Sequence, residues 1–301
     1  MNTKHQTPII KINNLSKRYP NGYGIFNIDL CVNQGEVFGY LGPNGAGKST
    51  TIRTIMGYIK PDEGNCEVFD YNSWNDAAII QSQVGYLPGE IAFPEFMTGT
   101  EFIKLVFNLR NQSNWNEVED LIKYWEFDPN KKIKKMSKGM KQKVGLIIAF
   151  MHHPRLIILD EPTTGLDPLM QQKFIDLVNE RKQQKTTFLM SSHIFEEIEK
   201  TCDKVAIVKS GRIVSNFDLA KLRQENERYY TVTFNTKEIL KTYKILKQSK
   251  NQVTYSILPN QVPQFIKDLN NYDLEMISEN PFSLEKYFMN FYKDAGGPDV
   301  K

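Results

Sequence analysis

The chain has 301 residues, of which 40% are hydrophobic and 24% are charged, with a net charge of +3. This composition is typical of globular protein, its length fits about two domains, and its charge is too small to require nucleic acid or an anionic membrane as partner. No apolar run approaches the roughly 20 residues of a membrane-spanning helix, and the first ten residues lack a signal-peptide core, so we expect neither a membrane span nor secretion. The three widely spaced cysteines indicate no disulfide framework or zinc site, which fits a reducing cytosol.

The first part of the chain predicts strands that lead into a helix. Strand patterns cover 9–12 and 25–32, on either side of a turn at Pro20-Asn21-Gly22. A short apolar strand over 36–41 then runs into a glycine-rich loop, and apolar residues at helical spacing follow over 49–59. We therefore expect a strand, a loop and a helix in direct succession.

The middle of the chain predicts a parallel sheet. Residues 98–151 have mostly helical patterns. Short apolar strands and helices then alternate, with strands over 156–159, 187–190 and 205–208 and helices over 171–182 and 194–200. Such alternation predicts an α/β fold whose mostly parallel sheet is covered on both faces.

The pattern changes after about Asp218, which predicts a second, smaller domain. Its expected strands are 229–234, 243–246 and 253–258, and its expected helices are 262–269 and 284–292. We expect one domain over 1–218 and an α+β domain over 219–301, with a disordered polar tail at 295–301.

The glycine-rich loop predicts a phosphate-binding site. It reads Gly42-Pro43-Asn44-Gly45-Ala46-Gly47-Lys48-Ser49-Thr50, which fits G-x-x-x-x-G-K-[ST] in the required strand–loop–helix context. Glycines let backbone N–H groups surround phosphate oxygens, and the helix N-terminus favours anions. Lys48 would supply a cation for the β- and γ-phosphates, and the Ser49 hydroxyl would bind Mg²⁺. The alternative is a glycine-rich turn with an unrelated lysine.

Two acids end the strand over 156–159. Ligands of open α/β sheets bind at the carboxyl ends of strands, so Asp160 is placed to hold Mg²⁺ through its water shell. Glu161, one residue on, is placed to orient and deprotonate an attacking water. A solvated acidic pair is the alternative, and the phosphate loop upstream disfavours it.

Together with three further motifs, these residues resemble the nucleotide-binding subunit of an ABC transporter over 9 to about 217. The motifs are Met136-Ser137-Lys138-Gly139-Met140 (the signature, usually LSGGQ), Gly165-Leu166-Asp167-Pro168 and Ser192-His193. The resemblance implies a P-loop NTPase cassette with a mostly parallel core sheet, an antiparallel β subdomain and a helical subdomain over about 88–152. It also implies ATP and Mg²⁺ as cofactors.

The resemblance assigns roles to five residues outside the phosphate loop. Ser137 and Gly139 would face the γ-phosphate of a second ATP-binding subunit, so that two subunits enclose two ATP molecules head to tail. Asp167 would lie across the dimer interface, His193 would contact the γ-phosphate and hold Glu161 and water in line, and Tyr19 would stack on adenine. Four of the five have a structural alternative: a helix cap at Ser137, a structural histidine at His193, and turn residues at Asp167 and Tyr19.

The chain departs from the family pattern at two places. The signature has Lys138 and Met140 where the family usually has glycine and glutamine. A glutamine that normally touches Mg²⁺ is missing at about Gly89, and Glu90 is the alternative oxygen ligand there. The phosphate contacts expected of Ser137 are unaffected, but the metal ligands are left open.

We expect the ATP-hydrolysing motor of a membrane exporter for a drug, peptide or lipid, with Lys48, Glu161 and His193 as catalytic residues. A separate transmembrane subunit would dock near 89–110 at the cytoplasmic face, where Phe93 and Phe96 either meet this partner or pack on their own subdomain. The alternatives are an importer subunit and a soluble ATPase acting on nucleic acid or ribosomes. We expect no nucleic-acid partner, because the interval before the signature has no heptads and the lysines of 131–143 have no interleaved aromatic residues.

Overall fold

The structure is a computed structural model that describes the chain except for residues 1–6, 226, 237, 281–282, 286–287 and 289–301. It divides into two compact units, Met1–Asn216 and Phe217–Lys301. Among the described residues, no helix combines the length and the apolar character needed to span a membrane.

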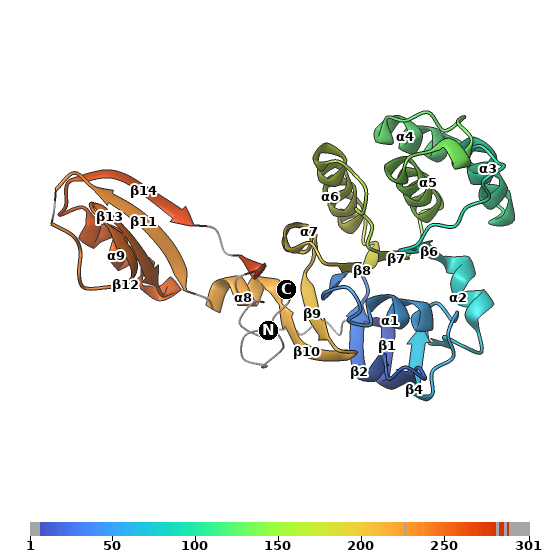
Figure 1. The fold of residues 1–301 in the computed structure, drawn as a ribbon, viewed down its shortest axis with the longest axis horizontal. Helices are drawn as coiled ribbons and strands as arrows, with labels where there is room; N and C mark the ends of the chain where they lie inside the picture. The colour runs from blue at the N-terminus through green and yellow to red at the C-terminus, as the bar shows by residue number, and fades with distance from the viewer. Residues whose placement is uncertain (1–6, 226, 237, 281–282, 286–287, 289–301) are drawn as a thin grey trace. The chain divides into compact units, whose positions relative to one another are not determined.

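A six-stranded sheet forms the centre of unit 1, in the order β10-β9-β3-β8-β7-β6 (Figure 1). Its strands are β3 (Val37–Leu41), β6 (Val84–Leu87), β7 (Leu156–Asp160), β8 (Thr187–Ser192), β9 (Lys204–Lys209) and β10 (Arg212–Asp218). All pairings from β9 to β6 along this order are parallel. Because β7, β8 and β3 are neighbours that run in the same direction, the loops that follow them lie together at one edge of the sheet.

A second, antiparallel sheet has the order β2-β1-β4-β5. Its strands are β1 (Pro8–Arg18), β2 (Gly24–Asn33), β4 (Glu63–Val68) and β5 (Tyr71–Asn72), and the nearby helices are α1 (Lys48–Ile55) and α2 (Ala77–Gln83). Apolar side chains of α1, such as Ile52 and Ile55, share one buried core with residues of both sheets. This packing holds the start of α1, where the phosphate loop ends, against rigid structure.

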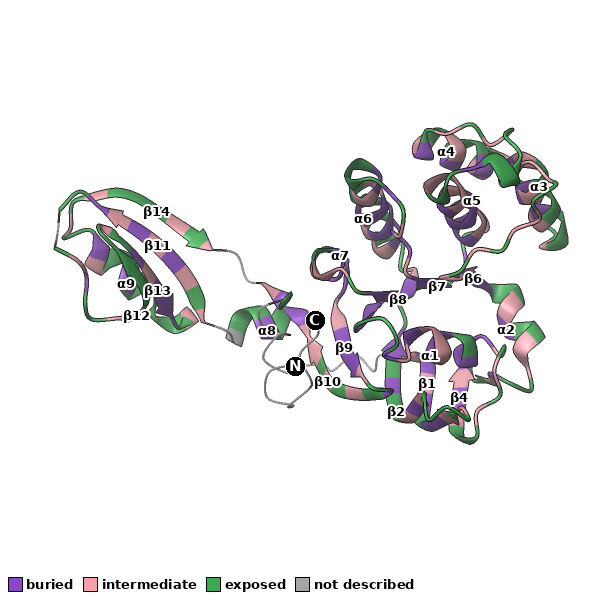
Figure 2. Cartoon of the chain, in the orientation of Figure 1, coloured by how far each residue is buried: buried purple, intermediate pink, exposed green. Residues whose placement is uncertain are grey.

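A group of helices extends from the β6–β7 side of the central sheet (Figure 1). It comprises α3 (Gly99–Leu109), α4 (Asn116–Trp125), the short 3₁₀ helix η1 (Ile133–Lys135) and α5 (Lys138–Phe150). Thr98 and Glu101 form a capping box at the start of α3, and Trp125 is fully buried. Two further helices, α6 (Pro168–Gln183) and α7 (Phe195–Thr201), come before and after β8 in the chain. Buried residues concentrate on the central strands (Figure 2).

Unit 2 is a four-stranded antiparallel sheet with a helix packed on one face. The sheet has the order β12-β13-β11-β14, and the unit comprises α8 (Leu219–Glu225), β11 (Arg228–Phe234), β12 (Lys244–Ser249), β13 (Gln252–Ile257), η2 (Pro259–Gln261), α9 (Val262–Leu269) and β14 (Leu274–Asn280). Phe265 of α9 is fully buried, and its ring lies 5.1–5.3 Å from those of Tyr230, Tyr243 and Tyr255. This aromatic cluster is the core of the unit.

The structure confirms the expected fold class, with a mostly parallel core sheet, an antiparallel sheet and a helical subdomain. The helix expected over 49–59 is wrong at its end, because α1 ends at Ile55 and Gly57 follows at a φ of +71°. A Cβ at Gly57 would lie 2.3 Å from the carbonyl oxygen of Ser73, so only glycine fits the left-handed turn that follows the helix. The strand β14 was not expected.

Two expectations fall on residues that the structure describes only in part. In the helix expected over 284–292, only Leu284, Glu285 and Phe288 are described, and all three are helical. The polar tail at 295–301 lies outside the described residues. The domain boundary expected at 218 stays a prediction.

Replacing Phe265 with alanine is expected to destabilise unit 2 by about 3–5 kcal/mol, because a buried aromatic ring is removed from the centre of the core. Hydrogen exchange of the full chain in urea should show lost protection over β11–β14 and unchanged protection over β3, β7 and β8. The neighbouring Ile266 is 41% exposed and provides the matched control, Ile266→Ala. An equal loss from both variants would contradict the assigned core.

Candidate functional site

The phosphate loop connects β3 to α1 and holds a buried cation. Lys48 is only 5% exposed, and its ammonium group donates to the carbonyl oxygens of Gly42, at 2.7 Å, and Pro43, at 3.2 Å. Gly47, the residue before α1, has a φ of +104°, and a Cβ there would lie 2.8 Å from Ile25 Cγ2. Only glycine fits this backbone without strain, so the sequence pattern has a steric cause.

The loop borders a cavity of about 310 Å³. Its lining comprises Tyr19, Tyr23, Gly24, Asn44, Gly45, Gly47, Lys48, Ser49, Thr50 and Glu161. Six of the nine predicted phosphate-loop residues therefore line the cavity, whereas Gly42, Pro43 and Ala46 do not. A cavity bordered by a glycine-rich loop, a helix N-terminus and one ammonium group suits a polyphosphate.

Two acids meet this loop from the end of β7. Asp160 is buried and accepts a hydrogen bond of 2.5 Å from the Ser191 hydroxyl. The same hydroxyl oxygen accepts from the backbone N–H of Glu161 at 3.1 Å. Ser191 of β8 thus orients both acids, and sequence reasoning missed it although it directly precedes Ser192-His193.

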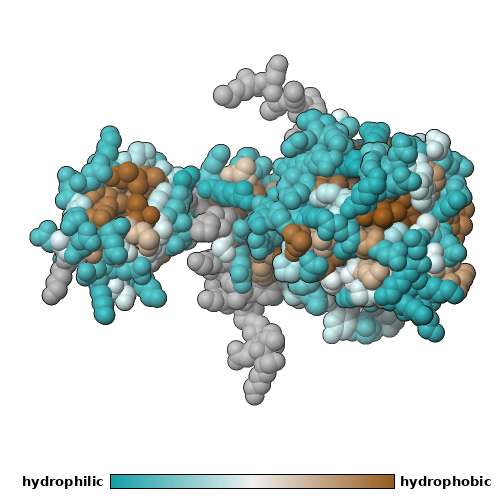
Figure 3. Space-filling model, turned by 90° about the horizontal axis from the view of Figure 1, so that it is seen from above, coloured by the Kyte–Doolittle hydropathy of each residue, from teal (hydrophilic) through white to brown (hydrophobic). Residues whose placement is uncertain are grey.

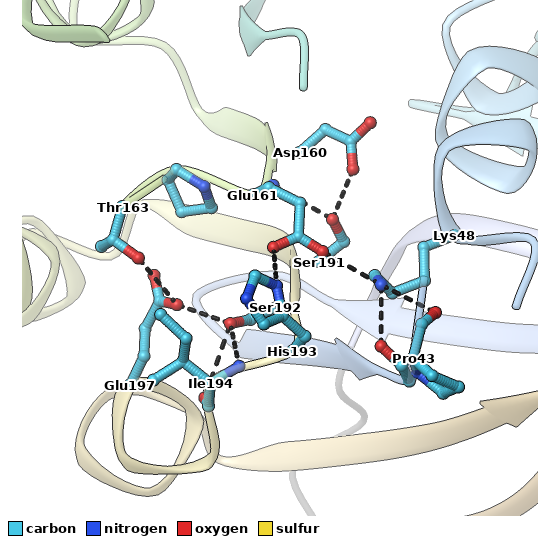
Figure 4. Close-up of polar contacts among 12 residues, drawn as sticks. Pro43, Lys48, Asp160, Glu161, Thr163, Ser191, Ser192, His193, Ile194 and Glu197 are labelled. Carbon is cyan, nitrogen blue, oxygen red and sulfur yellow. Dashed lines mark hydrogen bonds and ion pairs between the residues drawn. The ribbon is translucent and has the colours of Figure 1, made fainter. Parts of the chain in front are cut away.

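Glu161 stands between Lys48 and His193 (Figure 4). Its Oε1 lies 3.0 Å from the Lys48 ammonium, an ion pair without hydrogen-bond geometry, and its Oε2 lies 2.5 Å from His193 Nδ1. The backbone of Glu161 has a φ of +53°, which is uncommon for a residue with a side chain. Its hydrogen bonds to Ser191 stabilise this turn, which is a conformation that recurs at functional sites.

A glutamine from the signature helix supports the loop that carries the acids. Gln142 of α5 is buried, and its amide donates to the carbonyl oxygens of Pro162, at 2.7 Å, and Glu161, at 3.3 Å. A movement of α5 would therefore shift the backbone of Glu161. Sequence reasoning missed this residue because nothing in the spacing shows which face of α5 meets the loop.

Ser137, Gly139 and Asp167 lie outside the cavity lining. Ser137 is exposed and caps α5 by accepting from the Met140 N–H at 3.2 Å, and Asp167 is exposed and caps α6. Gly139 is packed against Gly165, whose carbonyl oxygen would lie 2.6 Å from a Cβ at 139. The signature and the Asp167 turn thus contact each other and present polar groups to solvent.

The structure places Gly89, not Glu90, against the buried acid. A Cβ at Gly89 would lie 2.9 Å from Asp160 Oδ2. The Glu90 side chain is 93% exposed and lies 3.9 Å from the Arg53 guanidinium. A metal-binding role for Glu90 stays a prediction.

The oxygen-bearing side chains at this site suit a magnesium ion that binds together with a nucleotide. No group of three or more His, Cys, Asp or Glu residues able to hold a metal occurs among the described residues. Asp160 is nevertheless a buried carboxylate with one oxygen engaged by Ser191, and Ser49 lines the cavity. Mg²⁺ commonly binds through one or two protein ligands together with substrate phosphates.

Comparison with known proteins identifies the family. The ABC transporter family model matches residues 25–164. The bacitracin transport ATP-binding protein BcrA of Bacillus licheniformis is 30% identical over 93% of this chain and 96% of its own length. The chain belongs to the ABC transporter ATP-binding family. It is an ATPase subunit of an ABC transporter, as the resemblance implied.

Other relatives and solved structures agree with this family. The linearmycin resistance ATP-binding protein LnrL of Bacillus subtilis (strain 168) is 32% identical over 69% of this chain and 68% of its own length. A solved ATP-binding subunit of an ABC transporter is 31% identical, covers 72% of this chain and 92% of its own, and has a TM-score of 0.65. The dimeric ATP-binding cassette MJ0796 bound to ADP and Pi, at 21% identity over 70% of this chain and 98% of its own, shares the fold with a TM-score of 0.64.

Replacing Lys48 with alanine is expected to weaken ATP binding at least about 10²-fold, because the cavity loses its buried cation. Titration of the full chain with a fluorescent ATP analogue measures the affinity. The control is Lys11→Ala, which removes an exposed lysine paired with Asp70. Equal affinity in the Lys48 variant and the control would remove Lys48 from the binding site.

Proposed function

We propose that the chain is the ATP-hydrolysing motor of an exporter, acting with a separate transmembrane subunit at the cytoplasmic face of the membrane. The contact of Lys48, Glu161 and His193 beside the phosphate loop supports the part of this proposal that concerns ATP hydrolysis. The names of the relatives, bacitracin transport and linearmycin resistance, support export of an amphipathic antimicrobial compound.

Nucleotide binding would use the cavity lining directly. Backbone N–H groups of the phosphate loop and the Lys48 ammonium would hold the phosphates, and Tyr19 would stack on the base. Tyr23 is a second aromatic lining residue, 67% exposed, that is also placed to meet the base. Ser49 and Asp160 would hold Mg²⁺, which neutralises charge on the phosphates during transfer.

Glu161 would act as the general base. In the structure its carboxylate is engaged on one side by Lys48 and on the other by His193. Incoming phosphates compete for the Lys48 cation, which leaves Glu161 free to accept a proton from water. His193 would then hold Glu161 and the water in line with the γ-phosphate.

A second ATP-binding subunit would complete the site. Ser137 and Asp167 are exposed helix caps, and with Gly139 they lie outside the lining of their own chain's cavity. The Ser137 hydroxyl and the backbone N–H groups at the start of α5 suit an anion presented by a second copy or a related chain. We propose that ATP is enclosed between the phosphate loop of one subunit and Ser137 of the other.

The segment around 89–110 is proposed as the docking surface for the transmembrane subunit. Phe93 packs on Phe102 within the helical subdomain, with ring centroids 4.8 Å apart, whereas Phe96 is 78% exposed. On α3, Leu105 and Leu109 are also exposed. Figure 3 shows that hydrophobic residues reach the surface among hydrophilic ones. Exposed aromatic and aliphatic side chains of this kind favour a protein partner.

Replacing Glu161 with glutamine is expected to preserve ATP binding and slow ATP turnover at least about 10²-fold. The base is lost, while Lys48 keeps its hydrogen bonds to Gly42 and Pro43 and its place in the phosphate loop. Phosphate release and nucleotide affinity are measured on the same full-chain sample. The control, Glu63→Gln, changes an exposed acid paired with Arg18. Normal turnover in the Glu161 variant would exclude it as the base.

Replacing Phe96 with alanine is expected to weaken binding to the transmembrane subunit about 30-fold without changing the ATPase activity of the chain alone. The partner to test is a multi-helix membrane protein encoded beside this chain, co-expressed and co-purified in detergent. Tyr71→Ala, at an exposed aromatic residue of β5, is the control. Undiminished co-purification of the Phe96 variant would move the docking surface elsewhere.

The export proposal itself is tested by ATP turnover of the co-purified complex in lipid vesicles. Amphipathic antimicrobial peptides are expected to stimulate turnover of the wild-type complex and not of the Glu161→Gln complex. Stimulation only by a small polar solute would contradict export of an amphipathic compound.

A further inference from the structure

A buried acid lies beneath the loop that carries His193. Glu197 of α7 is 3% exposed, and its Oε2 accepts a hydrogen bond of 2.6 Å from the Ser192 hydroxyl. The Ser192 oxygen in turn accepts from the backbone N–H of Ile194 at 2.9 Å. Glu197 therefore holds the residues on both sides of His193.

The same carboxylate oxygen also reaches the loop of the proposed base. Thr163, two residues after Glu161, donates its hydroxyl to Glu197 Oε2 at 3.3 Å. The loops of Glu161 and His193 thus share one acceptor, and Figure 4 shows Glu197 with Thr163 on one side and Ser192 on the other. Because Glu161 and His193 touch at 2.5 Å, a small shift of either loop would change that contact.

The second carboxylate oxygen has no partner among the described residues. Glu197 Oε1 is buried, and Glu197 lines a cavity of about 130 Å³ that also involves Thr163, Gln171, Ile194 and Lys200. A buried oxygen without a hydrogen bond is costly, so packing alone does not explain a charged residue at this position. Sites that sacrifice stability in this way are often functional.

We propose that Glu197 is a positioning residue for ATP hydrolysis, which fixes His193 against Glu161 by holding Ser192 and Thr163 at once. The proposal rests on the roles proposed above for Glu161 and His193. Glu197 touches neither nucleotide nor water in this account. It sets the distance and orientation between two residues that do.

The charge of Glu197 is set by its surroundings. Burial raises its pKa from an ordinary value of 4.5 to about 7; the Ser192 and Thr163 hydrogen bonds oppose this, and the negative charge of Glu161 adds to it. The other titratable groups near it are Glu196 and Lys200, which pair with each other on α7, the buried Cys202, and His193, which directly follows Ser192. From α6, the side chains lining the cavity are uncharged: Pro168, Gln171, Gln172 and Ile175.

As pH rises, the ionisation of Glu197 should change the stability of the fold and the rate of ATP turnover in opposite directions. Its folded pKa is raised, so ionised Glu197 lowers the free energy of unfolding as pH rises through about 7. The ionised form makes the stronger, charge-assisted bond to Ser192, so turnover should rise as pH rises through about 7, where the loss of stability that begins near pH 4.5 comes to its end. A merely structural residue would move stability and turnover in the same direction.

The test measures kcat, KM for ATP and the melting temperature of the full chain for wild type, Glu197→Gln and Glu197→Ala. We expect kcat to fall about 10-fold or more in the alanine variant and less in the glutamine variant, which keeps an acceptor for Ser192, with KM unchanged. The glutamine variant should melt no lower than wild type at pH 8. The matched control is Glu196→Gln, at an exposed acid one residue away, with unchanged kcat.

The pH dependence and a double-mutant cycle complete the test. The ratio of wild-type to Glu197→Gln kcat should rise between pH 6 and 8, because effects shared by both enzymes cancel. Combining Ser192→Ala with Glu197→Ala should cost little more than either change alone. A constant ratio, additive losses, or parallel losses of kcat and melting temperature would overturn the proposal.

Failure of this inference is distinguishable from failure of the proposed function. If His193→Ala and Glu161→Gln are slow while the Glu197 variants turn over normally, Glu197 has no positioning role and the roles proposed for His193 and Glu161 stand. If Glu161→Gln turns over normally, the proposed base is wrong and the positioning role of Glu197 falls with it.

Discussion

An ammonium group enclosed in a loop of backbone carbonyls is the constraint on which this site depends. Lys48 is almost fully buried, and two carbonyl oxygens and the Glu161 carboxylate replace the water it has lost. Removing a charge from water costs several kcal/mol unless such partners are present, so the loop, the helix start and the acid must be built together. The consequence is a cation that is already in place for phosphate. It lies beside Glu161, the proposed base, and pairs with its charge until phosphate competes for it.

Other buried side chains hold Glu161 in position beside Lys48. Ser191 orients Asp160 and Glu161 from the neighbouring strand, and Gln142 brings the signature helix into contact with the same loop. Glu197 ties the Glu161 loop to the His193 loop from below. Three buried polar groups from three elements thus hold the segment that carries Glu161, although Oε1 of Glu161 and Oε1 of Glu197 have no hydrogen-bond partner among the described residues. The exposed caps at Ser137 and Asp167 have no role in this network, which is consistent with their use by another subunit.

Sequence alone predicts the parts of this molecule that depend on local chemistry. The phosphate loop, the apolar strand that ends in Asp160 and Glu161, and the periodic helices follow from glycine spacing and hydrophobic patterns. The end of α1 was misplaced although Gly57 gives a local signal for it, because glycine at a positive φ commonly follows the last residue of a helix. Ser191, Gln142 and Glu197 were missed because a serine, a glutamine and a glutamate are common residues, and only the pairing of β7 with β8 and the packing of α5 and α7 bring them to the acids.

We propose that one ATP is held by Lys48 of one subunit and by Ser137 of another. The most direct test mixes two inactive variants, Lys48→Ala and Ser137→Arg, and measures ATP turnover. A mixed dimer contains one complete site, formed by the intact Lys48 of one chain and the intact Ser137 of the other, so the account predicts that turnover appears on mixing. Turnover no greater than the average of the two separate variants would contradict a site shared between subunits.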